Sequence, residues 1–94
     1  MRTEDEIEEA VQEFLDKVWY GRHCATPTAD IIDDPSMSKA DRNIKKQAQK
    51  AAAEIEEKYG DELGPMSDFD WGMLNGKLSA LRWVLGDEWD MLDT

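Results

Sequence analysis

The amino-acid sequence predicts an all-α fold: a small three-helix bundle with helices at about residues 3–20, 38–59 and 67–85, followed by a short C-terminal turn or tail. Three observations predict it. Apolar residues recur at helical spacing in the first two segments, and the third is apolar on most sides. Each segment begins at a Ser or Thr followed three residues later by an acidic residue, and glycines separate the segments. Because the chain has 94 residues, we expect one helical domain over residues 1–94.

The first helix is predicted from its cap and its apolar stripe. Thr3 and Glu6 have the spacing of a capping box, in which each side chain accepts a hydrogen bond from the other residue's backbone N–H. The stripe that follows at three-and-four spacing consists of Ile7, Ala10, Val11, Phe14, Leu15 and Val18. Gly21 suits the left-handed residue that ends a helix, so we expect the helix to stop at residue 20.

The second helix is predicted to follow a loop over residues 21–35, which contains two prolines and no sustained period. Ser38, with Asp41 three residues later, marks its start, and Gly60 marks its end after Tyr59. Its predicted buried stripe is Ala40, Ile44, Ala48, Ala51, Ala52, Ile55 and Tyr59. Most of these side chains are methyl groups, so another helix can approach this stripe closely.

The third helix is predicted to begin at the Ser67 cap, with Asp70 at the matching position, and to end at Gly86. Its apolar residues are spread around most of the circumference: Phe69, Trp71, Met73, Leu74, Leu78, Leu81, Trp83, Val84 and Leu85. A helix that is apolar on most sides needs cover on most sides. Gly72, Gly76 and Ala80 recur every four residues and predict a shallow groove. A glycine inside a helix costs about 1 kcal/mol relative to alanine, which indicates a packing reason for two of them.

Composition excludes several classes of protein. The formal net charge is −11, from 22 acidic and 11 basic residues, while 40% of the residues are hydrophobic. That apolar fraction is too high for a disordered acidic tail, and the charge argues against direct nucleic-acid binding. No segment has the length of a membrane span or the pattern of a secretion signal, and a single cysteine cannot form an intrachain disulfide. We therefore expect a cytoplasmic protein without membrane contact.

No catalytic, cofactor or metal site is predicted. His23 and Cys24 are the chemical candidates, because an imidazole can activate a thiol, but no third orienting group is identifiable. The aspartates at 30, 33 and 34 lack the spacing of calcium or zinc ligands and are interpreted as turn and cap residues. A non-enzymatic protein without cofactors is expected.

Residues 39–50 carry a local net charge of +4, from five basic residues and Asp41. Arg42, Lys46 and Lys50 fall in one row, which could contact phosphate or an acidic partner. Aromatic residues, which would strengthen a nucleic-acid interpretation, are missing there. A solvated or salt-bridged face is the favoured interpretation.

The sequence favours a protein-interaction function centred on the third helix and its tail. The protein would self-associate or dock on a larger host protein through apolar contacts, with the acidic residues after the helix forming a polar rim. The predicted interface is Trp71, Leu74, Gly76, Leu78, Leu81, Trp83 and Trp89, with Asp87, Glu88 and Asp90 in the rim. The alternative is an acidic inhibitor that imitates nucleic acid and blocks a DNA- or RNA-binding protein. Its phosphate stand-ins would be Glu8, Glu9, Glu13 and Asp16.

The stretch DWGMLNGKLSALRWVLGDEWDMLDT, residues 70–94, resembles the ends of short bacterial or phage-encoded proteins to which no activity is attached. The resemblance covers about the last quarter of the chain and implies a prokaryotic origin. The acidic, compact and cysteine-poor composition is also similar to that of some phage-encoded inhibitors of host defence, including anti-CRISPR proteins. That second likeness is one of composition and not of motif.

Overall fold

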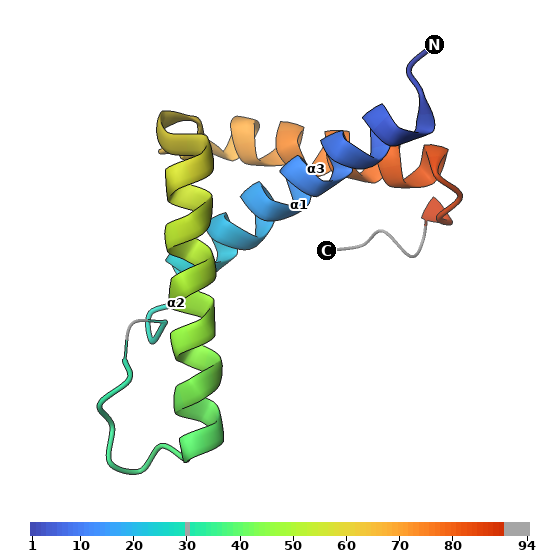
Figure 1. Ribbon diagram of the computed structural model, residues 1–94. Helices are drawn as coiled ribbons and strands as arrows, with labels where there is room; N and C mark the ends of the chain where they lie inside the picture. The colour runs from blue at the N-terminus through green and yellow to red at the C-terminus, as the bar shows by residue number, and fades with distance from the viewer. Residues whose placement is uncertain (30, 90–94) are drawn as a thin grey trace. The chain divides into compact units, whose positions relative to one another are not determined.

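Three α-helices account for most of the chain in the computed structural model, which describes residues 1–29 and 31–89 (Figure 1). They are α1 (Glu4–Ala25), α2 (Lys39–Tyr59) and α3 (Asp68–Val84), and a short 3-10 helix, η1 (Gly60–Leu63), follows α2. The described residues contain no strand, and none of their helices has the length and hydropathy that a bilayer span requires. The predicted all-α fold with three main helices is confirmed.

The chain divides into two compact units. Unit 1 comprises Met1–Val18 and Pro65–Thr94, and unit 2 comprises Trp19–Gly64. The boundary falls within α1, so the first part of this helix belongs to unit 1 and its last residues to unit 2. Two compact units that share a helix can form one domain or two. The single domain expected over residues 1–94 therefore stays a prediction.

The predicted helix starts are confirmed by their hydrogen bonds. The Glu6 backbone N–H donates to Thr3 Oγ1, and the Thr3 N–H donates to Glu6 Oε1, each over 3.2 Å. This backbone hydrogen bond, together with Arg2 and the Thr3 hydroxyl, lowers the pKa of Glu6. Ser38 caps α2 by accepting from the Asp41 N–H, and Ser67 forms a full capping box with Asp70 at the start of α3. Each cap satisfies N–H groups that have no partner inside the helix.

The predicted end of α1 is wrong, because the helix continues through Gly21 to Ala25. Gly21 does not have the positive φ of a helix-ending glycine, whereas Gly60 and Gly86 do, at 53° and 113°. The helix closes where the Thr26 hydroxyl donates to the Arg22 carbonyl over 3.0 Å, and Pro27 follows directly. Gly21 therefore lies inside α1, where a glycine costs about 1 kcal/mol relative to alanine.

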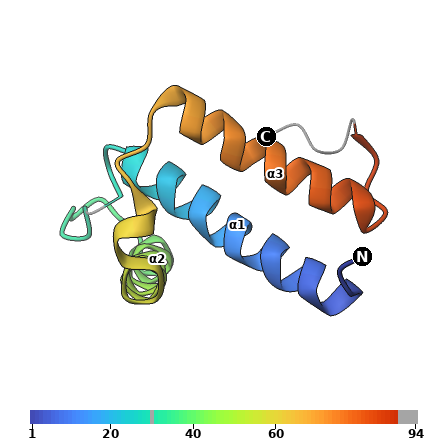
Figure 2. The ribbon, with the colours of Figure 1, turned by 90° about the horizontal axis from the view of Figure 1, so that it is seen from above.

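Unit 1 is held together by α3 packing along the first part of α1 (Figure 2). Its buried cluster is Val18 of α1 with Leu74 and Leu78 of α3. The partly buried residues around this cluster are Val11, Phe14, Met66 and Trp71. The most buried of these side chains is Leu78, which is 2% exposed. No large hydrophobic side chain of the described residues is buried more completely, so the core is small.

In unit 2 a hydrogen bond from one hydroxyl joins the end of α1 to α2. Ala52 and Tyr59 are the buried members of the predicted α2 stripe, and the Tyr20 hydroxyl donates to Glu56 over 2.6 Å. The stripe is buried only in its second half: Ala40 is exposed and Ile44 is 63% exposed. The first half of α2 instead carries side chains that bind the preceding loop.

Candidate interaction surface

Two apolar faces run along α3, and they have different surroundings. At about 100° per residue, Trp71, Leu74, Leu78 and Leu81 project from one side of the helix, which we call the inner face. This face meets the core cluster around Val18, where Leu74 and Leu78 are buried and Trp71 is partly buried. The inner face therefore serves the core of unit 1.

The opposite side of α3, which we call the outer face, is apolar and exposed. It comprises Phe69, Gly72, Met73, Gly76, Ala80, Trp83 and Val84. Phe69 is 74% exposed, Met73 46% and Trp83 49%. This apolar surface covers roughly a third of the helix circumference. Soluble monomers rarely expose a continuous surface of this kind, and such surfaces are typical of interaction sites.

A shallow groove follows the outer face. It is lined by Asp68, Phe69, Gly72, Met73, Gly76, Lys77 and Ala80. A Cβ atom added at Gly72 or Gly76 would meet no atom within 4 Å. The small-residue groove predicted from the sequence therefore exists, but no side chain of residues 1–29 or 31–89 fills the space beside its two glycines. The packing reason expected for the two glycines is absent from the described residues of a single chain.

Two tryptophans close the C-terminal end of the outer face. The indole rings of Trp83 and Trp89 are stacked, with centroids 5.1 Å apart and an interplanar angle of 11°. The turn between them is built on Gly86, and Arg82 Nε donates to Asp87 Oδ2 over 3.0 Å across it. The salt bridge and the glycine thus bring Trp89 back onto Trp83, where both rings remain about half exposed.

The predicted interface residues fall into three groups. Leu74 and Leu78 are buried in the core, and Trp71 and Leu81 are partly buried, so these four leave little surface for a partner. Five others are exposed, as an interface requires: Gly76, Trp83, Asp87, Glu88 and Trp89. Asp90 lies outside the described residues.

Sequence reasoning left Phe69, Met73 and Val84 out of the predicted interface, although all three are exposed on the outer face. The signal that could have found the first two is the alternating four-and-three spacing of residues 69, 73, 76, 80 and 83. Trp89, the predicted interface residue of the tail, is linked to the same face by its stacking on Trp83.

The acidic residues proposed as phosphate stand-ins lie on α1, and two of them already have partners. Lys17 donates to Glu13 over 2.8 Å, and the Gln12 amide donates to Asp16 over 2.9 Å. Glu8 and Glu9 are exposed. Of these partners only Lys17 carries a charge, so among the four carboxylates the salt bridge offsets the charge of Glu13. The nucleic-acid-mimicking alternative stays a prediction.

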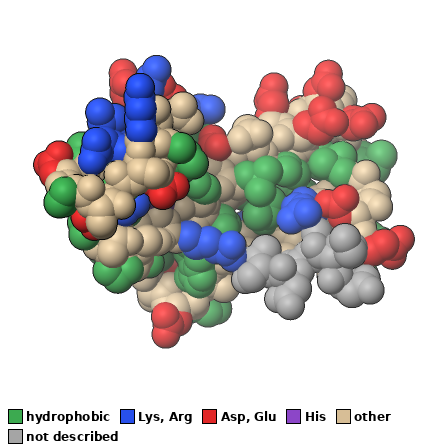
Figure 3. Space-filling model, turned by 90° about the horizontal axis from the view of Figure 1, so that it is seen from below, with side chains coloured by type: hydrophobic (Ala, Val, Ile, Leu, Met, Phe, Trp, Pro, Cys, Tyr) green, Lys and Arg blue, Asp and Glu red, His purple; other side chains and the backbone are tan. Residues whose placement is uncertain are grey.

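Charge is divided unequally between the units. Unit 1 has 13 acidic and four basic residues, a net charge of −9, whereas unit 2 has nine acidic and seven basic residues, a net charge of −2. Figure 3 shows acidic side chains along an edge of unit 1 and Lys and Arg side chains gathered on unit 2. The acidity of the chain therefore resides mainly in unit 1.

Two of the basic residues of α2 bind the preceding loop. Arg42 Nε donates to the Ile32 carbonyl over 2.9 Å, and Lys45 Nζ donates to the Thr28 carbonyl over 2.6 Å. In the same loop the Ser36 hydroxyl and N–H bind Asp34 and lower the pKa of its carboxyl. Because Arg42 is engaged in this way, the predicted row of Arg42, Lys46 and Lys50 is not a row of three free cations.

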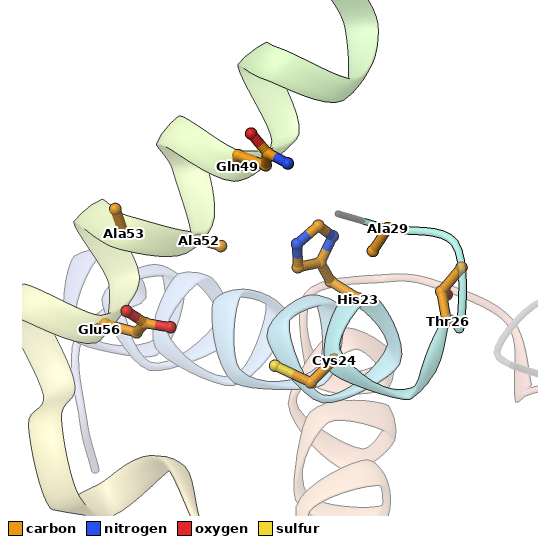
Figure 4. A pocket seen from close by; sticks show the side chains of 8 residues that line it. All are labelled: His23, Cys24, Thr26, Ala29, Gln49, Ala52, Ala53 and Glu56. Carbon is orange, nitrogen blue, oxygen red and sulfur yellow. The ribbon is translucent and has the colours of Figure 1, made fainter. Parts of the chain in front are cut away.

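A hollow in unit 2 lies between the end of α1 and α2 (Figure 4). It has a volume of about 280 Å³ and is lined by His23, Cys24, Thr26, Ala29, Gln49, Ala52, Ala53 and Glu56. Small-molecule sites usually occupy about 300–1,000 Å³, so this hollow is at or below the lower limit. Among the described residues, no group of three His, Cys, Asp or Glu side chains is arranged to hold a metal ion.

His23 and Cys24 do not form a nucleophile and base pair in this hollow. Figure 4 shows the imidazole and the thiol pointing in different directions. The His23 ring stacks on Trp19, with centroids 4.9 Å apart. The neighbouring Tyr20 donates to Glu56, and this hydrogen bond, together with Cys24, raises the pKa of the phenol. The Tyr20–Glu56 hydrogen bond attaches the end of α1 to α2.

Comparison with known proteins gave no relative. No protein-family model, no curated protein and no solved structure matches the chain significantly. The resemblance of the C-terminal stretch to short bacterial or phage-encoded proteins accordingly stays a prediction.

Proposed function

We propose that this protein is a non-enzymatic protein-interaction module that docks through the outer face of α3. The observation that carries the proposal is the exposure of Phe69, Met73 and Trp83 around an open glycine groove. Leaving this much apolar surface in water is unfavourable, at roughly 25 cal/mol for each Å². A protein partner that covers the outer face would remove that cost.

The composition of the outer face also fits an interface. Aromatic residues and methionine are enriched at the centres of interfaces, and charged residues are depleted there. The outer face has Phe69, Met73 and Trp83, and the charged residues Asp68 and Lys77 lie at the edges of its groove. Asp87 and Glu88 follow the helix and are exposed, which suits the polar rim of such a surface.

The proposal is tested by comparing what the tagged protein and its outer-face variant capture from a prokaryotic extract that also contains the untagged chain. In the variant, Phe69→Ser and Met73→Ser are combined; both side chains point away from the core, so we expect unchanged helicity by circular dichroism. The wild type should retain a protein, whether a second species or the untagged chain, and the variant should lose it.

The matched control is Ile44→Ser, which removes a similarly exposed apolar side chain from α2. It should retain whatever the wild type retains. If the Phe69 and Met73 variant captures the same proteins as the wild type, the outer face is not the docking surface. Binding that survives these changes, weakens steeply with salt and is competed by DNA would favour the acidic-inhibitor alternative instead.

A further inference from the structure

The outer face of α3 has the side-chain spacing of a helix-pairing surface. Residues 69, 73, 76, 80 and 83 follow one another at intervals of four, three, four and three, which is the repeat of a coiled-coil seam. All five residues are apolar and lie on the outer face. A helix that is laid along this face would therefore stay in contact over most of the length of α3, about 25 Å.

Four residues of the outer face are arranged symmetrically in size about Gly76, whereas Met73 has the smaller Ser79 at the matching position. Phe69 precedes Gly76 by seven residues and Trp83 follows it by seven, while Gly72 and Ala80 flank it at four. A twofold axis at Gly76, with two α3 helices antiparallel, would place Phe69 of each copy level with Trp83 of the other. An interface between identical subunits must be self-complementary in this way.

The open space at the glycines would let two such helices come close. Apart from the neighbouring backbone of α3 itself, no described atom lies within 4 Å of a Cβ built at Gly72 or Gly76, so the groove is open at these glycines. Small residues at a helix crossing allow the backbones to approach and the flanking large side chains to interdigitate. Here Phe69 and Trp83 would flank the crossing at its two ends.

The charges of α3 are also arranged to suit an antiparallel copy. The helix has two acidic residues, Asp68 and Asp70, in its first turn and two basic residues, Lys77 and Arg82, in its second half. It is therefore neutral within a chain of net charge −11. An antiparallel pair brings the acidic turn of each helix level with the basic half of the other, whereas a parallel pair would bring like charges together.

Resting on the proposed function that the outer face is a docking surface, we infer that its occupant is a second copy of this chain, forming an antiparallel α3–α3 homodimer about Gly76. Among its described residues, unit 1 has three buried hydrophobic side chains in its core cluster, and the single cysteine offers no intrachain disulfide. Association of identical subunits is one of the few ways in which so small a core gains burial.

The solution mass by light scattering, over a series of concentrations and salt, tests the homodimer. We expect the 10.8 kDa chain to double its mass as concentration rises. High salt should favour the dimer, because it screens the repulsion between two acidic chains. Gly76→Leu should raise the dissociation constant by about 100-fold through overpacking at the crossing, while Ile44→Ser leaves it unchanged. A monomer at all concentrations, or a dimer indifferent to Gly76→Leu, would overturn the inference.

Cysteine cross-linking in a Cys24→Ser background tests the antiparallel orientation. Lys77→Cys places a thiol next to the proposed axis, so mild oxidation should yield a covalent dimer. Asp68→Cys places the two thiols about 24 Å apart along the helices in an antiparallel pair and side by side in a parallel one. Efficient cross-linking through residue 68 and none through residue 77 would contradict the antiparallel arrangement.

The inference and the proposed function fail in different ways. If the chain is monomeric but captures another protein that the Phe69→Ser and Met73→Ser variant loses, the homodimer is wrong and the docking surface remains. If the chain is monomeric and the variant captures the same proteins as the wild type, both are wrong.

Discussion

Both faces of α3 are apolar, but the inner face is buried and the outer face is exposed. The inner face buries Leu74 and Leu78 against α1, whereas the outer face leaves Phe69 and Trp83 in solvent. Hydrophobicity therefore does not decide which face of this helix is buried. What decides it is which face has a neighbouring helix, and one helix covers one stripe of another. An apolar face that remains after the core is assembled is then available for a partner.

The largest difference between the faces should appear when one side chain is shortened on each. In dilute solution, Leu78→Ala should lower the free energy of unfolding by about 3 kcal/mol, because it removes buried methyl groups and leaves a cavity. Met73→Ala, on the outer face, should change it by less than about 0.5 kcal/mol. Urea unfolding followed by circular dichroism measures both. Equal losses would mean that the outer face is also covered within the single chain.

A smaller effect is expected when the helix that carries both faces loses its cap. Ser67→Ala removes the acceptor of the Asp70 N–H, 3.1 Å away, and one half of the capping box. The expected loss is about 1 kcal/mol, with fraying of the first turn of α3. Amide hydrogen exchange of residues 68–71 should quicken in this variant while that of α2 does not. Unaltered exchange in this turn would show that packing, rather than the cap, holds it.

Whether Gly76→Ala raises or lowers the free energy of unfolding distinguishes an open groove from a filled one. The new Cβ meets no neighbouring side chain among the described residues, so in dilute solution the better helix propensity of alanine should stabilise α3 by about 0.5–1 kcal/mol. Thermal unfolding at low protein concentration measures it, with Ala80→Gly as the reverse control. A loss of stability in the dilute sample would mean that Gly76 is already closely packed within its own chain.

The smallest effect is expected at the end of the outer face. Trp89→Ala removes the ring that stacks on Trp83, and because both rings are exposed the stability should fall by less than about 1 kcal/mol. The near-ultraviolet circular dichroism should nevertheless lose the contribution of the coupled indoles. An unchanged spectrum would contradict the stacked pair.

Most of the fold could be predicted because its determinants are local. The caps at Thr3, Ser38 and Ser67 depend on residues three positions apart, and so their prediction needed no knowledge of tertiary contacts. Gly60 and Gly86 also act locally, through their positive φ. Gly21 was misinterpreted because the sequence does not show the contacts with α2 on either side of this glycine: Tyr20 donates to Glu56 before it, and Lys45 donates to the Thr28 carbonyl after it.

The candidate site could be predicted only in part. The sequence by itself determined that α3 is apolar around most of its circumference and that Gly72, Gly76 and Ala80 form a groove. Only the tertiary structure decided that Leu74 and Leu78 face α1 and that Phe69 and Met73 do not. The physical reason is that periodicity specifies which residues share a face, whereas burial depends on which face meets another helix, and that choice is made by packing between segments far apart in the chain.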